Sequence, residues 1–157
     1  MSEKRPITPA GRRRFEDELR RLWHEDRPRI VQEVADAAAL GDRSENAEYI
    51  YGKRKLREID RRIGYLNHLL ERLEAIEPKT MKADHVRFGA TVEIQDEEGQ
   101  RRVYQIVGED EVDAKSGRIS MKSPVGKALL KKKVGDVAVI ARPAGEIEVE
   151  LIALRYE

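Results

Sequence analysis

Two acidic residues with a serine between them are the strongest candidates for chemistry in this sequence. Asp42, Ser44 and Glu45 lie between two long stretches that have the residue spacing of coiled-coil helices. The run Leu40–Tyr49 therefore predicts the tip of a helical hairpin, where Gly41 is suited to the positive φ angle that often ends a helix. Two carboxylates at such a tip could complete the ligand shell of a Mg²⁺ that keeps most of its ligands on a partner.

The same residues also have a purely structural interpretation. Asp42 can cap the following helix while Glu45, three residues later, returns a bond as in a capping box. Such a cap contributes about 1 kcal/mol and is common on proteins that carry no chemistry. Spacing alone favours the cap, because two carboxylates by themselves hold Mg²⁺ only weakly.

A basic run follows the tip and offers a surface for phosphate groups. It sets six cations against two acids, Glu58 and Asp60, and the six are Lys53, Arg54, Lys55, Arg57, Arg61 and Arg62. These charges leave the apolar seam of the helix free, which suits a rod that guides an RNA backbone. We expect the RNA-contacting residues, called the basic face below, to be Lys53, Arg54, Arg57 and Arg61. An ordinary solvated helix face is the alternative.

Other kinds of site find little support in the sequence. It contains no glycine-rich phosphate loop and no visible nucleophile triad. There is no cysteine, which excludes disulfides and thiolate metal sites. His24, His68 and His85 are not spaced as metal ligands. Trp23, Tyr49, Tyr51 and Tyr65 are expected to pack rather than to stack on bases, although Tyr49 is close enough to the tip to leave base stacking open there.

The composition favours an exposed helical rod joined to a small globular unit. Charged residues make up 39% and aromatic residues 5% of the 157 residues, which is too polar for one compact sphere. No apolar run approaches the roughly 18 residues of a membrane helix, and the N-terminus lacks the apolar core of a signal peptide. We therefore expect a cytoplasmic protein without membrane contact.

Two heptad patterns predict the arms of the rod. Thr8 and Pro9 suit the cap and the first residue of the first helix. Its seam slips around Arg27–Pro28, where the proline predicts a kink. Small residues, among them Ala37 and Gly52, predict a close approach of the arms near the tip. The second seam is regular and consists of Leu56, Ile59, Ile63, Leu66, Leu70 and Leu73.

The apolar period changes to two after residue 85, which is typical of strands. Ser123 and Pro124 predict the start of a short helix that runs through Leu130. The strands are predicted over residues 86–94, 102–107, 118–121, 137–140 and 146–154.

The expected fold class is α+β, in two domains. An antiparallel coiled-coil hairpin is predicted over residues 1–77, with its acidic tip at 41–48. A linker over 78–85 then leads to a small antiparallel sheet with one short helix over 86–157.

Several runs of this sequence resemble the bacterial GreA/GreB family of transcript cleavage factors. The tip carries the pattern Gly-Asp-x-x-Glu-Asn-Ala-Glu-Tyr, and further matching runs lie at residues 22–28, 55–62, 123–130 and 134–136. The tip and the run Arg57–Arg62 resemble the GreB branch more than the GreA branch. The resemblance covers nearly the whole chain.

This resemblance implies a coiled coil that enters the secondary channel of bacterial RNA polymerase, and an FKBP-like C-terminal domain that holds the channel rim. Asp42 and Glu45 would stabilise the second catalytic Mg²⁺ of the polymerase when the 3′ end of the nascent RNA has backtracked. Ser44 would help to orient the attacking water. The protein would stimulate endonucleolytic RNA cleavage as an accessory factor, not as an enzyme, and would bind no Mg²⁺ tightly alone. We expect a monomer.

The resemblance also implies a rim-docking position at Lys122, Ser123 and Pro124. The family usually carries an acidic residue before this Ser-Pro pair, and this sequence has Lys122 instead. The departure predicts altered charge matching at the rim, unless the cognate polymerase compensates for it.

Two other classes of function remain open. A Gre-like protein could occupy the secondary channel and inhibit the polymerase without promoting cleavage; the intact Asp42 and Glu45 argue against this, and an RNA cleavage assay would decide. An FKBP-like fold could also be a prolyl isomerase. Two Phe and one Trp in the whole chain make an aromatic proline pocket hard to build.

Overall fold

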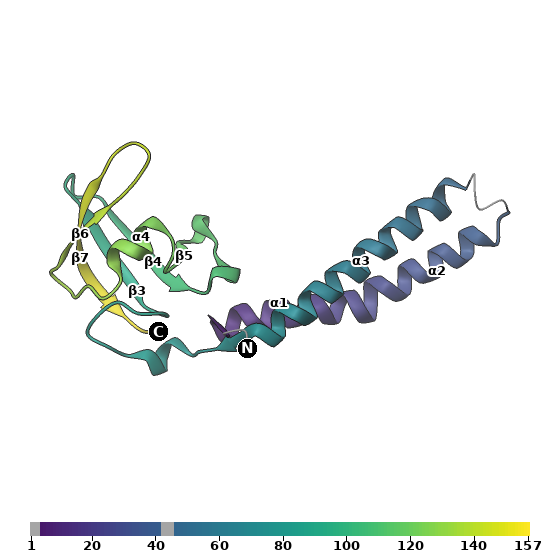
Figure 1. Ribbon diagram of the computed structural model, residues 1–157, viewed down its shortest axis with the longest axis horizontal. Coiled ribbons are helices and arrows are strands. Elements are labelled where there is room, and N and C mark those ends of the chain that lie inside the picture. Colours follow the sequence, from purple (N-terminus) through teal and green to yellow (C-terminus); the bar gives the residue numbers. More distant parts are fainter. Residues whose placement is uncertain (1–3, 42–45) are drawn as a thin grey trace. The chain divides into compact units, whose positions relative to one another are not determined.

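The computed structural model describes residues 4–41 and 46–157, which form two compact units. The helical unit consists of Arg12–Arg72, and the sheet unit combines the N-terminal residues up to Gly11 with Leu73–Glu157. Figure 1 shows α2 and α3 in the first unit, and α4 with strands β3 to β7 in the second. The predicted α+β class is confirmed.

The first arm of the hairpin is a run of helix with one irregular turn. It contains α1 (Pro9–Arg21), a π-helical turn (Leu22–Asp26) and α2 (Arg27–Ala38). Thr8 caps α1, because its Oγ1 accepts a hydrogen bond from the backbone N–H of Gly11 at 3.1 Å. The π-helical turn ends two residues before Pro28, which has no backbone N–H to donate, and such turns are a common cause of helix bending. The slip predicted around Arg27–Pro28 is therefore this wider turn.

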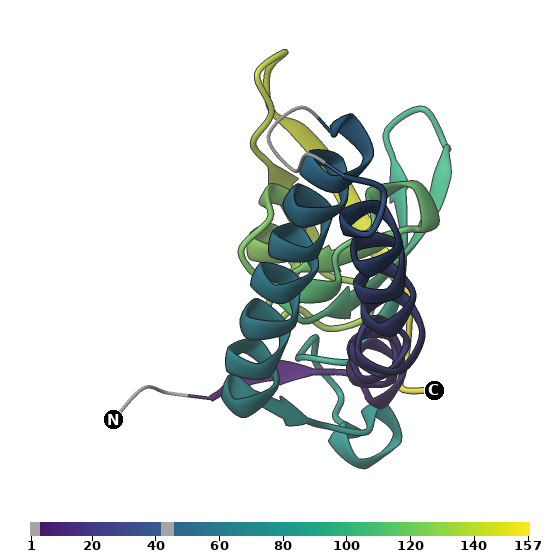
Figure 2. The same cartoon turned by 90° about the vertical axis from the view of Figure 1, so that its right-hand side faces the viewer.

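The second arm is α3 (Ala47–Arg72), which runs beside the first arm in both views (Figure 2). One cluster of buried side chains between them consists of Ile30 of α2 and Ile59 and Ile63 of α3. Partly buried side chains extend this core on both arms: Leu19, Leu22, Val34 and Leu56. The seam is confirmed over this part. No helix within the described residues has the length and apolar character needed to cross a membrane.

The end of the second seam differs from the prediction. Leu69 is buried and Leu70 is only half-buried, although the heptad pattern favours Leu70. Leu73 lies outside the helix, in β2 (Leu73–Ala75), which pairs in parallel with β1 (Arg5–Ile7). Strands of three residues are too short to show a period of two, so this small sheet was not predicted.

The arms approach each other closely near the tip. Ala37 and Gly52 are both buried. A Cβ atom added at Gly52 would lie 2.7 Å from Cγ2 of Val34, closer than packed atoms can come. This confirms the predicted use of small residues at these two positions.

The sheet unit is built on a five-stranded sheet in the order β5-β4-β3-β7-β6. The strands are β3 (Thr91–Asp96), β4 (Arg101–Val107), β5 (Arg118–Ser120), β6 (Val137–Ile140) and β7 (Ile147–Arg155). All neighbours are antiparallel except β4 and β5, which are parallel. The helix α4 (Pro124–Leu129) adds Leu129 to a core that includes Val92, Ile106 and Leu151.

Two predicted boundaries were wrong. The hairpin does not include residues 4–11 and 73–77, which belong to the sheet unit. The strand predicted over 86–94 begins only at Thr91. Before it, the backbone turns at Gly89, which adopts φ +88° and packs on Pro78. A Cβ atom added at Gly89 would lie 3.1 Å from the Cα of Pro78. The predicted linker likewise contains a 3₁₀ turn (Pro78–Met81). Apolar alternation before Thr91 thus marks buried turns rather than a strand.

Candidate functional site

The predicted tip residues Asp42, Ser44 and Glu45 lie outside the described residues, but both of their flanks are described. Gly41 adopts φ +131°, which confirms the positive φ predicted there. No atom lies within 4 Å of a Cβ added at Gly41, so the backbone angle and not lack of space favours glycine.

The N-cap residue of α3 is Asn46, whereas the capping box that the sequence allows for Asp42 and Glu45 lies outside the described residues. The helix begins at Ala47, and Oδ1 of Asn46 accepts a hydrogen bond from the backbone N–H of Tyr49 at 3.1 Å. Asparagine is among the best N-cap residues. Asn46 is a second residue in this stretch of the sequence that suits an N-cap, four positions after Asp42.

Asn46 makes a second bond that the sequence did not suggest. Its Nδ2 donates to the backbone carbonyl of Ala37 in α2 at 2.6 Å. The same carbonyl accepts from the backbone N–H of Leu40 at 3.2 Å. One half-buried side chain therefore joins the last turn of α2 to the first turn of α3.

The cations of the basic run fall into two groups. Lys55 Nζ lies 3.9 Å from Glu58, and Arg62 binds Glu18 through its Nε at 2.6 Å. That hydrogen bond lowers the pKa of Glu18, although partial burial acts in the opposite direction. The remaining acid of the run, Asp60, binds Arg27 of the first arm at 2.8 Å. The acids near the run are therefore paired with Arg27, Lys55 and Arg62.

The basic face is the group that is left over. Lys53, Arg54, Arg57 and Arg61 are all exposed, and none has an ion-pair partner among the described residues. Side chains three or four positions apart lie on one side of a helix, so these four form one stripe. Arg57 and the buried Ile59 are two positions apart and point to nearly opposite sides. The stripe therefore faces away from the first arm.

The predicted rim-docking residues lie at the start of α4. Ser123 caps this helix, accepting from the backbone N–H of Gly126 at 3.0 Å and donating to the Ser120 carbonyl at 2.7 Å. Pro124 is the first helical residue. An added Cβ at Gly126 would collide with the Ser120 carbonyl, so the turn admits only glycine. These contacts fix the direction of the Ser-Pro pair.

Lys122 is 78% exposed but has a partner. Its Nζ lies 2.6 Å from Oε2 of Glu109, and Glu109 also lies 3.2 Å from Arg5 of β1. The hydrogen bond from Lys122 lowers the pKa of Glu109. The position that is unusual for its charge therefore presents an ion pair, not a bare cation.

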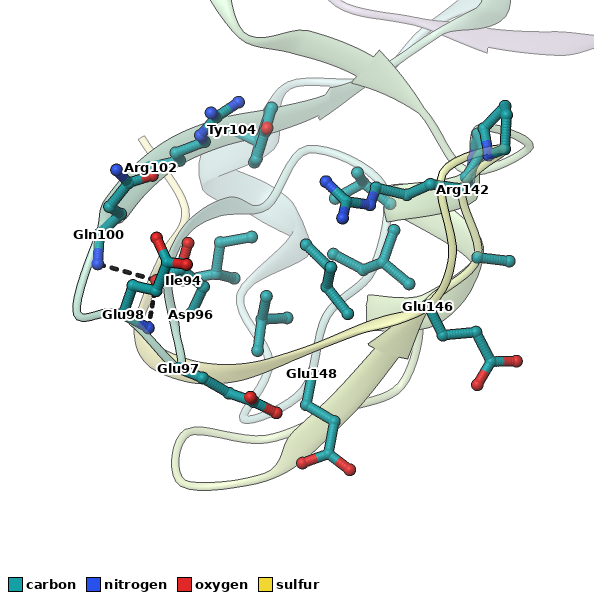
Figure 3. A pocket seen from close by; sticks show the side chains of 17 residues that line it. Ile94, Asp96, Glu97, Glu98, Gln100, Arg102, Tyr104, Arg142, Glu146 and Glu148 are labelled. Carbon is teal, nitrogen blue, oxygen red and sulfur yellow. Dashed lines mark hydrogen bonds between the residues drawn. The ribbon is translucent and has the colours of Figure 1, made fainter.

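A cavity of about 610 Å³ opens beside Pro124 (Figure 3). Its lining is apolar where Val125 meets residues of the sheet, and Tyr104 is its one aromatic residue among those described. Arg142 extends from the β6–β7 connection toward the middle of the cavity. Five acidic residues are among those that line the cavity: Asp96, Glu97, Glu98, Glu146 and Glu148. A single tyrosine is a poor match for the aromatic pocket that a prolyl isomerase needs.

Comparison with known proteins identifies the family. A family model described as "Transcription elongation factor, N-terminal" matches residues 5–74, and one described as "Transcription elongation factor, GreA/GreB, C-term" matches residues 81–156. The chain belongs to the GreA/GreB family of transcription elongation factors.

Relatives from this family align over almost the whole chain. Transcription elongation factor GreB of Haemophilus ducreyi is 49% identical over 146 residues, 93% of this chain and 90% of the relative. Transcription elongation factor GreB of Haemophilus influenzae is 46% identical over 157 residues, 100% of this chain and 99% of the relative. A solved structure of the transcription factor Gfh1 covers 99% of both chains with 27% identity and a TM-score of 0.46.

The sheet unit of this Gre-family chain contains a buried charge that sequence reasoning missed. Glu111 accepts hydrogen bonds from the backbone N–H groups of Thr8 at 2.7 Å and Gly108 at 2.9 Å. It also accepts from the Thr8 hydroxyl and, at 2.9 Å, from Arg118 Nη2. Gly11 is required beside it, because an added Cβ would collide with the Glu111 carboxylate. The contact between Thr8 and Glu111 joins residues 103 positions apart, so no local sequence pattern predicts it.

Proposed function

We propose that this Gre-family protein enters the secondary channel of bacterial RNA polymerase and stimulates endonucleolytic cleavage of backtracked RNA. Membership of the family of transcription elongation factors supports the polymerase as partner. The structural observation that carries the proposal is the basic face, four exposed cations without ion-pair partners among the described residues, on the arm that follows the acidic tip.

Asp42 and Glu45 are the proposed ligands of a catalytic Mg²⁺ in the polymerase. Mg²⁺ takes about six oxygen ligands, so two carboxylates supply a minority of the shell and the polymerase supplies the rest. In phosphoryl chemistry such an ion activates the attacking water or stabilises the leaving oxygen. Ser44, which lies between the two acids in the sequence, is the residue that we propose, from the family resemblance, to orient that water. The protein acts as an accessory factor to the enzyme.

The basic face is the proposed contact for the extruded 3′ end of the RNA. Lys53, Arg57 and Arg61 follow one another at intervals of four residues, about 6 Å along a helix axis. Exposed cations at this spacing can track a phosphate backbone, and the attraction falls with salt. Lys55 and Arg62 are engaged by carboxylates and are not part of the contact.

Rim docking is proposed for Lys122, Ser123 and Pro124. The cap made by Ser123 fixes the turn, and Lys122 with Glu109 presents a local ion pair to the rim. Lys122→Asp would place two carboxylates together and should weaken binding to the cognate polymerase, while binding to a polymerase with a basic rim improves. Unchanged binding to both polymerases would place Lys122 outside the contact.

A purified cleavage assay tests the proposed function. Backtracked elongation complexes of the cognate polymerase are mixed with the protein, and shortened RNA is measured with time. We expect faster cleavage that depends on Mg²⁺ and restarts arrested complexes. Binding to the polymerase without faster cleavage would contradict the proposal, and would favour a factor that only occupies and inhibits the channel.

A further inference from the structure

The two hydrogen bonds of Asn46 have different consequences for the hairpin. The bond from Tyr49 N–H to Oδ1 is local to α3 and is an ordinary helix cap. The bond from Nδ2 to the Ala37 carbonyl crosses from one arm to the other. Only the second can fix the distance between the ends of the two helices.

We propose that Asn46 is a positioning residue that sets the separation of the helix ends from which the acidic tip is presented. This inference rests on the proposed function, because the tip matters only if it delivers ligands to the polymerase. Asn46 does not touch the metal or the RNA in this account. It acts by holding together the two backbone segments that lead into and out of the tip.

Packing between the arms stops short of the tip, which leaves this task to the asparagine. The outermost buried residues of the two arms, among those described, are Ala37 and Gly52, and Gly52 lies against Val34. Beyond them Leu40 is 77% exposed, and Ile50 and Tyr51 are exposed as well. Among the described residues, the bond from Asn46 to Ala37 is the outermost polar link between the arms.

The chemistry of the side chain explains why an amide is needed here. A cap requires only an acceptor, and Asp or Ser would serve about equally well. The bond to Ala37 requires a donor on a second atom, and the planar amide carries both groups on one carbon. Asp has no donor when ionised, and the single oxygen of Ser cannot span both partners.

The position of the tip should therefore affect the rate of cleavage more than binding. A displacement of about 1 Å at a reacting centre can lower a rate by as much as a hundredfold. Contacts made by the basic face and by the sheet unit do not involve Asn46. Loss of the cross-link should leave the affinity for polymerase unchanged and lower the maximal cleavage rate.

Three variants separate the cap from the cross-link. Asn46→Asp and Asn46→Ser keep the cap and remove the donor, while Asn46→Ala removes both. Asp adds a charge near the tip and Ser does not, so each controls for the other. We expect the maximal cleavage rate to fall on the order of tenfold in all three, at an unchanged half-saturating concentration. Only Asn46→Ala should lose helix stability as well.

A distance measurement between the two arms tests the cross-link independently of RNA cleavage. The chain has no cysteine, so Ala35→Cys in α2 and Glu48→Cys in α3 provide two exposed sites for spin labels without background labelling. The distance distribution between the labels should broaden with Asn46→Asp and Asn46→Ser. Matched distributions, or maximal rates equal to wild type in both variants, would overturn the positioning role. A wild-type protein that stimulates no cleavage would instead overturn the proposed function, whatever the distances show.

Discussion

Glu111 in the sheet unit and the basic face in the helical unit represent opposite uses of charge. The Glu111 side chain is 2% exposed and is surrounded by donors from Thr8, Gly108 and Arg118. The cations of the basic face are exposed, and their neighbouring acids are bound elsewhere. A charge that is satisfied within the chain stabilises the fold. A charge left without a partner is available to another molecule.

Glu111→Gln should have the largest effect on stability. The substitution keeps the shape but places an amide donor among groups that all donate, and leaves Arg118 without its carboxylate. Removing one partner of a buried pair costs about 3 kcal/mol or more. The free energy of unfolding, measured by denaturant titration, should fall by this amount. Glu150→Gln, on the exposed side of β7, is the control and should be nearly neutral; an equal loss in both variants would refute the special role of Glu111.

Gly52→Ala tests the close packing of the two arms at Val34. The new methyl group would meet Val34 Cγ2, and the stiff β-branched side chain cannot easily move aside, so we expect a loss of about 1–3 kcal/mol. Gly64→Ala is the matched control on the same helix, because nothing lies within 4 Å of its added Cβ. That variant should gain up to about 1 kcal/mol from helix propensity. Thermal unfolding of the two variants should shift in opposite directions, and a shared direction would contradict the close packing.

Removal of the basic face should change activity without changing the fold. Lys53, Arg54 and Arg57 replaced together by Ala should alter the unfolding free energy by less than about 0.5 kcal/mol per site. RNA cleavage should weaken most on long backtracked RNA, and the salt dependence should become shallower by about 0.7 per lost phosphate contact. Replacing three exposed cations of the sheet unit, Lys79, Lys82 and Lys115, is the charge-matched control. Equal losses on short and long RNA would indicate general docking instead.

Lys122→Met should have a small effect on stability, and that effect should depend on pH. Lys122 lowers the pKa of Glu109, so their pair stabilises the fold above the ordinary glutamate pKa of about 4.3. The contribution disappears as the pH falls through the lowered value. Because the Lys122 side chain is 78% exposed, solvent screening should keep the difference from wild type below about 1 kcal/mol at neutral pH. Denaturant titrations at neutral and acidic pH should show the difference shrinking, and a difference that grows on acidification would contradict the pairing.

The features that the sequence predicted are those with a repeating pattern. The heptad seam through Ile59 and Ile63, the start of α1 at Pro9 and the strand Val137–Ile140 all follow from local periodicity or capping chemistry. Positive φ at Gly41 and the cap at Ser123 follow from single residues with a strong backbone preference.

The features that escaped prediction depend on partners far away in the chain or on competition between two local signals. The pairing of β1 with β2 and the bonds of Glu111 to Thr8 join distant residues without any pattern. The cap at Asn46 was not predicted, because Asp42, one turn earlier, also suits a helix cap in the sequence. The roles of Asp42, Ser44 and Glu45 came from the resemblance to a family and remain predictions.

Asp42→Asn in the purified cleavage assay tests whether the tip supplies a ligand to the catalytic Mg²⁺. Asn46 caps α3, so this substitution should leave helix content and the melting temperature unchanged while it removes a negatively charged metal ligand. The variant should compete with wild type for the polymerase, because the basic face and the rim-docking residues are intact. We predict normal competition with a loss of RNA cleavage. Full cleavage by a folded, competing Asp42→Asn protein would contradict the metal-ligand role of the tip.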